Sequence, residues 1–123
     1  MQTLIVPDVH ENIKKLEEIY YTHMAGADQV VMLGDFWDTF SPYKQAQEAA
    51  EWVRAHIHDD KFTFCWGNHD CHYAFEHRAF RCSGYSPFAH QFIGEVLTEV
   101  DWRRFKVFTT VGKFLASHAG FHP

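Results

Sequence analysis

The stretch Gln29-Val30-Val31-Met32-Leu33-Gly34-Asp35-Phe36-Trp37-Asp38 joins a strand-like run to a polar turn. The apolar run is continuous rather than alternating, which is typical of a parallel strand that is covered on both faces. Gly34 permits a sharp turn directly after the run, and two aspartates follow it. We therefore expect a buried strand whose carboxyl end carries polar chemistry.

The same order of apolar run and polar turn recurs along the chain. The apolar runs are residues 3–6, 29–33, 61–66 and 113–117. The polar residues that follow them are Asp8 with His10, Asp35 with Asp38, Asn68 with His69 and Asp70, and His118. Ligands of open α/β sheets bind beyond the carboxyl ends of the strands, where parallel neighbours end side by side. We therefore expect these polar residues to gather in one place.

Helix-like patterns lie between the strands. Apolar residues recur at helical spacing over residues 13–24. Ser41-Pro42 and Ser86-Pro87 each combine an N-cap residue with a proline, which predicts a helix start at both places. Residues 71–84 have an irregular pattern, and residues 105–117 predict a hairpin that turns at Val111-Gly112. The alternation of strands and helices predicts an α/β layered fold with a largely parallel first half.

Composition limits the class of protein. The chain has 123 residues, 46% of them hydrophobic and 22% charged, which suits one globular domain over residues 1–123. No apolar run approaches the roughly 18 residues of a membrane span, and the N-terminus lacks the pattern of a signal peptide. A net charge of −5 argues against a non-specific binder of nucleic acid or of anionic membranes. Only three cysteines are present, so we expect a reducing, cytoplasmic location. The short apolar runs and the negative charge together predict no membrane partner.

The residue types at the strand ends are those of metal ligands. Carboxylate, imidazole and amide oxygen suit divalent ions such as Mn²⁺, Fe²⁺, Zn²⁺ or Mg²⁺. Asp8 and His10 are alternate residues leaving a strand, so their side chains can reach the same ion. A carboxylate such as Asp35 has two oxygens and can bridge two ions. Two ions about 3.5–4 Å apart are a common arrangement in enzymes that hydrolyse phosphoesters.

The motifs together resemble those of the calcineurin-like metallophosphoesterase superfamily. The matching motifs, in order, are Asp8-x-His10, Gly34-Asp35-x-x-Asp38, Gly67-Asn68-His69-Asp70 and a later His118. They correspond to the family's first four motifs and extend the resemblance from residue 4 to about residue 120. The resemblance implies the family fold, a layered α/β sandwich of two sheets flanked by helices. It also implies hydrolysis of a phosphoester, either a phosphodiester or a phosphomonoester.

The resemblance further implies a metal centre with two divalent ions. The implied ligands are Asp8, His10, Asp35, Asn68 and His118. Asp8 and His10 would bind the first ion, Asp35 would bridge the two, and the remaining pair would bind the second. Mn²⁺ is the first choice of metal, with Fe, Zn, Ni or Mg as alternatives.

The resemblance assigns His69 and Asp38 to catalysis. His69 would stand over the leaving group, either as a proton donor or as a charge that stabilises the departing oxygen. Asp38 would form a hydrogen bond to His69 and fix its orientation. A hydroxide bridging the two ions would attack phosphorus in line, without a covalent enzyme intermediate.

The family's fifth motif, Gly-His-x-His, is absent. The chain has seven glycines, and none of them precedes a histidine. Three explanations stay open: a truncated chain, a naturally minimal version of the fold, or a symmetric partner that completes the site. His122, four residues after His118, is a candidate replacement ligand. An incomplete second sheet would leave an open strand edge, which favours a homo-oligomer.

The substrate and one rival function stay open. Thr39-Phe40 stands after Asp38 where protein phosphatases have Arg-Gly, and Asp70 stands where they have glutamate. These departures favour a phosphodiesterase, a nuclease or a small-nucleotide hydrolase. The expected substrate is therefore a phosphoester that is a small molecule, a nucleotide or a nucleic acid. The rival is a truncated or non-catalytic metal-binding or interaction module, which metal would stabilise without turnover.

A second group of metal-ligand residue types lies outside these motifs. Its members are Cys71, His72, His77 and Cys82. Their spacing fits no standard zinc motif, so we expect an irregular loop there.

Overall fold

A computed structural model gives the fold and describes residues 1–120. The elements in chain order are β1 (Thr3–Val6), α1 (Ile13–Ile19), the π-helix η1 (Tyr20–Met24), β2 (Gln29–Met32), α2 (Ala46–His56), β3 (Phe62–Phe64), α3 (Asn68–Ala74), the 3₁₀-helix η2 (Arg78–Phe80), α4 (Pro87–Val96), α5 (Glu99–Trp102), β4 (Thr109–Val111) and β5 (Phe114–Ala116). His122, the candidate replacement ligand, lies outside the described residues.

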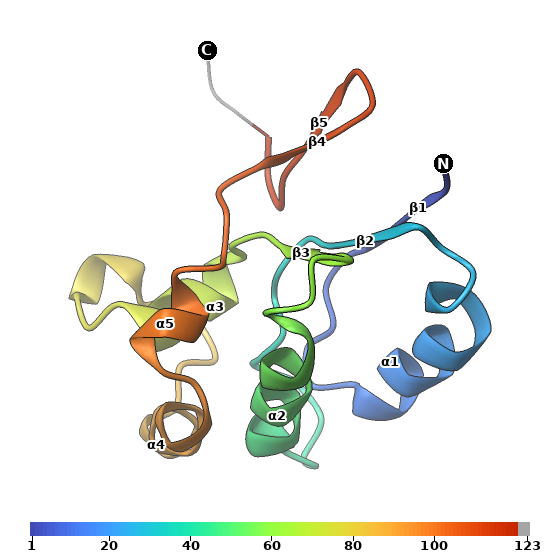
Figure 1. The fold of residues 1–123 in the computed structure, drawn as a ribbon. Helices are drawn as coiled ribbons and strands as arrows, with labels where there is room; N and C mark the ends of the chain where they lie inside the picture. The colour runs from blue at the N-terminus through green and yellow to red at the C-terminus, as the bar shows by residue number, and fades with distance from the viewer. Residues whose placement is uncertain (121–123) are drawn as a thin grey trace.

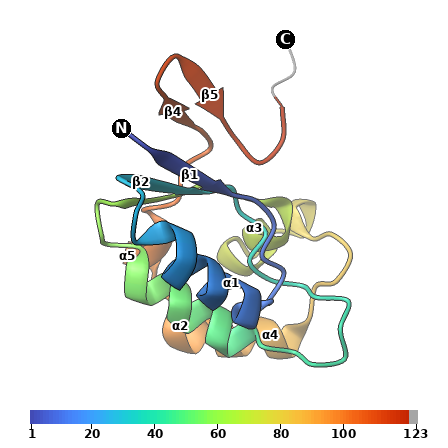
Figure 2. The ribbon, with the colours of Figure 1, turned by 90° about the vertical axis from the view of Figure 1, so that its right-hand side faces the viewer.

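The first three strands form one parallel sheet in the order β1-β2-β3. The helices lie along one face of this sheet, and the antiparallel β4–β5 hairpin projects on the other side (Figures 1 and 2). The predicted α/β class and the parallel first half are therefore confirmed. Among the described residues, no helix is long and apolar enough to cross a membrane.

The burial of the central strand β2 explains why its apolar run is unbroken. Val30 and Met32 are completely buried, and Val31 between them is 4% exposed, so both faces of the strand are covered. The edge strand β1 is less enclosed, and its Ile5 is 43% exposed. Beneath the sheet, Trp37 is fully buried and donates its indole N–H to the Ala46 carbonyl at the start of α2. The core thus fixes the loop after β2 against α2.

The helix predicted at Ser41-Pro42 begins later than expected, at Ala46. The physical reason is the buried carboxylate of Glu11, whose Oε1 accepts a hydrogen bond from Gln45 N at 2.6 Å. Its other oxygen accepts from Asp38 N at 2.9 Å, so Glu11 holds both ends of the intervening loop. The Ser41 hydroxyl accepts only a local bond from Tyr43 N and does not cap a helix.

The expectation of an irregular segment over residues 71–84 is partly wrong. Helix α3 covers its first four residues, and the short η2 lies within the remainder. The helix start at Ser86-Pro87 is confirmed, since Ser86 Oγ accepts a hydrogen bond from Ala89 N and the proline is in the first turn. The hairpin is also confirmed, with Gly112 at a φ of +59° in its turn.

The carboxylate of Asp101 stabilises the short helix α5. Its Oδ2 accepts hydrogen bonds from both N and Oγ1 of Thr98, and its Oδ1 lies 2.7 Å from His58 Nε2. Burial opposes ionisation, but the contacts with Thr98 and His58 outweigh it and hold the pKa of Asp101 below its ordinary value. A carboxyl whose folded pKa is lowered stabilises the fold at neutral pH, and this contribution disappears as the pH falls through the folded pKa.

We expect Asp101→Asn to lower the free energy of unfolding by about 1 kcal/mol at neutral pH, as the loss of a helix cap does. The difference from the parent protein should shrink toward zero as the pH falls through the lowered folded pKa of Asp101, because the parent carboxyl is then becoming protonated. Denaturant unfolding of both proteins at several pH values measures this. An equal difference at every pH would show that the charge of Asp101 is not responsible.

Candidate active site

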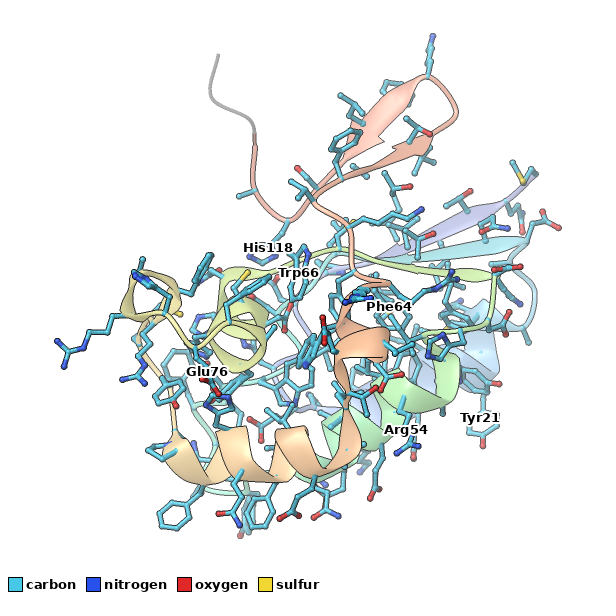
Figure 3. The ribbon with its side chains drawn as sticks, turned by 60° about the vertical axis from the view of Figure 1, so that its left-hand side comes forward. Tyr21, Arg54, Phe64, Trp66, Glu76 and His118 are labelled. Atoms are coloured by element: carbon cyan, nitrogen blue, oxygen red, sulfur yellow. The ribbon has the colours of Figure 1, made fainter. Side chains whose placement is uncertain are left out.

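The loops that follow the three parallel strands are joined directly to one another. His10 N donates a hydrogen bond to the Asp35 carbonyl at 2.8 Å, and Glu11 N donates to the Phe36 carbonyl at 2.7 Å. His118 approaches from the loop after β5, and its Nδ1 lies 3.0 Å from the Leu33 carbonyl (Figure 3). The residues predicted from the strand ends therefore lie at one edge of the sheet.

The backbone of these loops is strained. Among the described residues, those other than glycine with a positive φ are Asp8 (29°), His10 (44°), Glu11 (62°), Asp35 (58°) and Asp38 (69°). Such conformations cost about 1 kcal/mol or more each, and they persist only where the surroundings fix them. All five belong to the loops after β1 and β2. The strain therefore lies where the candidate site residues are presented.

Asp70 is the residue that fixes these loops, a role that was not predicted from the sequence. Its side chain is fully buried and accepts three backbone hydrogen bonds: from Asp35 N at 2.7 Å, Phe36 N at 2.8 Å and Gly67 N at 2.9 Å. Burial raises the pKa of Asp70 to about 7, against the lowering effect of these three N–H groups. An acidic residue three positions after a helix-capping glycine is the signal that could have indicated it.

Gly67 lies against Asp35 with no room for a side chain. A Cβ atom at Gly67 would lie 2.2 Å from Asp35 Oδ1 and 2.3 Å from Asp35 N. We expect Gly67→Ala to lower the free energy of unfolding by about 2–3 kcal/mol, because the two loops must separate. Denaturant unfolding measures the loss.

The matched control for this substitution is Gly94→Ala in helix α4, where an added Cβ meets nothing within 4 Å. This control should be neutral or stabilise the protein by up to about 1 kcal/mol. A Gly67→Ala protein as stable as the Gly94→Ala protein would contradict the close approach of the two loops.

The predicted metal ligands converge on one oxygen of Asp35. Its Oδ2 lies 3.7 Å from His10 Nε2 and 3.2 Å from His118 Nε2. His118 Nε2 is also 3.1 Å from Asn68 Oδ1. Asp8, His10 and Asp35 have ligand atoms within 4.8 Å of one another. All five predicted ligands therefore lie around Asp35, with Asp8 and Asn68 on the exposed side.

Only one oxygen of Asp35 faces both histidines. The other oxygen, Oδ1, accepts a hydrogen bond from His69 N at 2.9 Å. Oδ2 is therefore the oxygen of Asp35 that is directed toward the two histidines and would be available to a bound cation.

The orientation of the histidines fits a cation. His10 Nδ1 lies 2.8 Å from the Trp37 carbonyl, and His118 Nδ1 lies 3.0 Å from the Leu33 carbonyl. A carbonyl oxygen only accepts, so each Nδ1 carries the hydrogen. In the neutral ring Nε2 then presents a lone pair toward Asp35 Oδ2, which places acceptors opposite one another. A divalent ion between them would satisfy both, and carbonyl-anchored imidazoles are common among metal ligands.

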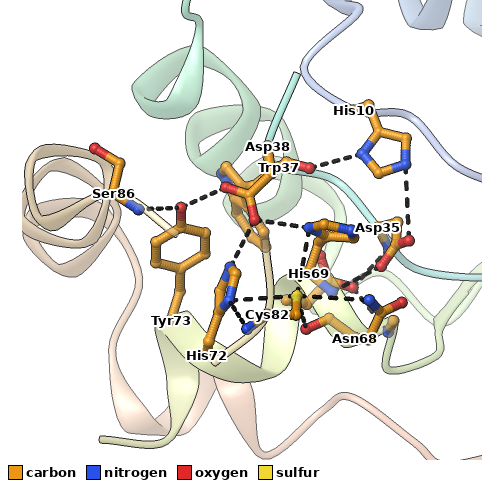
Figure 4. Close-up of polar contacts among 12 residues, drawn as sticks. His10, Asp35, Trp37, Asp38, Asn68, His69, His72, Tyr73, Cys82 and Ser86 are labelled. Atoms are coloured by element: carbon orange, nitrogen blue, oxygen red, sulfur yellow. Dashed lines mark hydrogen bonds and ion pairs between the residues drawn. The ribbon is translucent and has the colours of Figure 1, made fainter. Parts of the chain in front are cut away.

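His69 and Asp38 form the pair that the sequence predicted. His69 Nδ1 lies 2.9 Å from Asp38 Oδ2, and Tyr73 donates its hydroxyl to Asp38 Oδ1 (Figure 4). His72 Nε2 lies 2.6 Å from the same Oδ2. Burial of Asp38 opposes its ionisation, but the contacts with His72, Tyr73 and His69 hold the pKa of Asp38 below its ordinary value. Tyr73 and His72 were not foreseen as partners of this carboxylate.

The protonation state of this pair follows from Asp38. An ionised carboxylate only accepts hydrogen bonds, so Nδ1 of His69 carries a hydrogen and donates it. His69 Nε2 is then the ring atom that can exchange a proton with another group. The ring of His69 stands 5.2 Å from that of His10, centroid to centroid, so the pair borders the candidate metal centre.

Comparison with known proteins gives one match. A family model described as calcineurin-like phosphoesterase matches residues 1–122. That range includes all seven candidate residues, which lie in the loops after β1, β2 and β5 and at the start of α3. Comparisons with curated proteins and with solved structures give no significant match.

Proposed function

This chain belongs to the calcineurin-like phosphoesterase family, and we propose that it is a metal-dependent enzyme that hydrolyses a phosphoester at the site around Asp35. The family is generally dependent on divalent metal ions. The observation that carries the proposal is the arrangement of His10 and His118 about one oxygen of Asp35. Their Nε2 atoms lie 3.7 and 3.2 Å from Oδ2, with both Nδ1 atoms anchored on carbonyls.

The residues around Asp35 would hold two divalent ions, for which we propose Mn²⁺. Asp8 and His10 have ligand atoms within 4.8 Å of those of Asp35, Asn68 Oδ1 lies 3.1 Å from His118 Nε2, and His118 Nδ1 lies 3.6 Å from Asp8 Oδ1. These nitrogen and oxygen donors, without a thiolate, suit Mn²⁺ and its neighbours. When bound, such ions supply positive charge for the phosphoryl oxygens and lower the pKa of water so that it becomes a nucleophile.

His69 is the residue that we propose acts on the leaving group. Asp38 accepts from Nδ1 and keeps the ring in one orientation, so that Nε2 faces away from the carboxylate. From there a protonated His69 can donate to the departing oxygen, or its charge can stabilise that oxygen. Tyr73 and His72 hold Asp38 in turn, so this carboxylate has little freedom to rotate.

The test of this function is hydrolysis of two aryl esters, bis(4-nitrophenyl) phosphate and 4-nitrophenyl phosphate. We expect turnover of at least one with Mn²⁺ and none with excess chelator, and the preferred ester identifies a diesterase or a monoesterase. Metal-dependent thermal stabilisation without turnover of either ester would contradict the proposal. That outcome would favour the rival function, a metal-binding module without catalysis.

A further inference from the structure

Three metal-ligand side chains meet beside the candidate catalytic pair. Cys82, from the segment between η2 and α4, lies with its Sγ 3.6 Å from His69 Nδ1 and 3.6 Å from His72 Nδ1 (Figure 4). The ligand atoms of these three residues all lie within 4.8 Å of one another. We call His69, His72 and Cys82 the thiol cluster. It includes none of the five residues around Asp35, although Asn68 Nδ2 donates a hydrogen bond to Cys82 Sγ at 3.5 Å.

The two sulfur–nitrogen distances in the thiol cluster match those around a tetrahedral ion. A zinc ion has bonds of about 2.3 Å to sulfur and about 2.05 Å to nitrogen, which at a tetrahedral angle separate the two ligand atoms by about 3.6 Å. Both sulfur–nitrogen distances in the cluster have this value. One thiol with two imidazoles is also a donor set that favours zinc over manganese or magnesium.

His72 is already in the form that such a site needs. Cys82 N donates a hydrogen bond to His72 Nδ1 at 3.3 Å, so Nδ1 presents a lone pair toward the cluster. Nε2 then carries the hydrogen and lies 2.6 Å from Asp38 Oδ2. A histidine that binds a metal through one nitrogen commonly faces a carboxylate through the other.

Nε2 of His72 is also completely buried, and no described residue forms an aligned hydrogen bond with it. A metal on Nδ1 would take the place of the weak Cys82 N–H contact. It would also make the Nε2 hydrogen more acidic and strengthen its interaction with Asp38.

We propose that the thiol cluster is a second metal site, which binds zinc through Cys82 Sγ, His72 Nδ1 and His69 Nδ1 and thereby inhibits the enzyme. The inhibition rests on the proposed function. His69 Nδ1 is the atom that donates to Asp38, 2.9 Å away, and it cannot donate and coordinate at once. Zinc binding would therefore break the hydrogen bond between His69 Nδ1 and Asp38. The Cys82 thiol would release its proton when it binds the zinc.

The direct test uses Co²⁺ as a spectroscopic substitute for zinc on the whole protein. Co²⁺ bound by a thiolate has an intense charge-transfer band in the near ultraviolet, whereas Co²⁺ bound by the five proposed ligands around Asp35 has none, because none of them is a cysteine. We expect this band in the parent protein, its loss when zinc is added, and its loss in Cys82→Ser. Cys71→Ser is the matched control and should keep the band, because Cys71 lies on α3 outside the cluster.

The second arm measures inhibition of the Mn²⁺-activated hydrolysis by zinc, with each variant compared with its own zinc-free rate. We expect Cys82→Ser and Cys82→Ala to need at least about tenfold more zinc for half-inhibition than Cys71→Ser needs. Equal inhibition of all variants would place the inhibitory zinc elsewhere and overturn the regulatory claim.

The two arms separate this inference from the proposed function. A cobalt–thiolate band in a protein without turnover would support the metal site at the thiol cluster and contradict the proposed phosphoesterase activity. Turnover in a protein that never has the band would contradict the metal site at the thiol cluster and support the proposed phosphoesterase activity.

Discussion

Phosphoester hydrolysis by the Asp35→Asn protein is expected to be at least about a hundredfold to a thousandfold slower, the range found when one charge-stabilising group is removed. Asp35 Oδ2 faces both His10 Nε2 and His118 Nε2, so neutralising it weakens both proposed ions at once. The rate with Mn²⁺ and the Mn²⁺-dependent rise in melting temperature should disappear together. Substantial residual turnover would contradict the two-ion interpretation.

The fold should survive this substitution. The Asp35 Oδ1 that accepts from His69 N has an equivalent in the asparagine carbonyl, and Asp70 still accepts from the backbone at residue 35. Asp60→Asn is the matched control, because Asp60 is a surface carboxylate whose partner is Arg104 at 3.3 Å. It should keep the parent rate, and its stability should change by less than about 1 kcal/mol. An Asp35→Asn protein that is unfolded without metal would leave its rate uninformative, and Asp35→Glu would then replace it.

The His69→Asn protein should be slower by about a hundredfold to a thousandfold and still bind Mn²⁺. General acid catalysis contributes on this order, and the His69 side chain is not among the groups that face Asp35 Oδ2. The rate loss should be larger for an ester with a poor alkoxide leaving group than for a nitrophenyl ester, which needs little protonation. Steady-state rates on the ester with the alkoxide leaving group and on the nitrophenyl ester measure the first effect. Mn²⁺-dependent melting of the same samples measures metal binding.

A histidine away from the site provides the control for this variant. His77 is exposed, and its Nδ1 accepts a hydrogen bond from Ala79 N, so His77→Asn should leave both rate and metal binding at parent values. Loss of Mn²⁺-dependent stabilisation in His69→Asn would show that His69 is a metal ligand. Equal rate losses on the two esters would show that it does not assist the leaving group.

The parallel sheet and the convergence of the residues at its strand ends could be predicted, because local sequence patterns indicate both. Continuous apolar runs specify buried parallel strands, and parallel strands bring their carboxyl ends to one edge. The pair of His69 with Asp38 came only through the family resemblance. Spacing alone does not determine that contact, because it joins residues 31 positions apart.

The hydrogen bonds that hold the site loops in place could not be predicted, because they depend on the direction of buried carboxylate side chains. Asp70 and Glu11 each bind backbone N–H groups of a distant loop, up to 35 positions away. Glu11 also explains why the helix expected at Ser41-Pro42 begins late. The meeting of Cys82 with His72 depends on the path of the chain between η2 and α4, for which the sequence carries no periodic signal.

The measurement that tests the phosphoesterase account most directly is the rate of ester hydrolysis as Mn²⁺ is added to the metal-free protein in known molar ratios. Because His10 Nε2 and His118 Nε2 both lie within 4 Å of the same oxygen of Asp35, two ions per chain are expected to act together. We predict little hydrolysis at one equivalent, a steep rise as the second ion binds, and a plateau afterwards. Hydrolysis that needs no metal, that is complete at one equivalent, or that never occurs at any ratio would contradict the account.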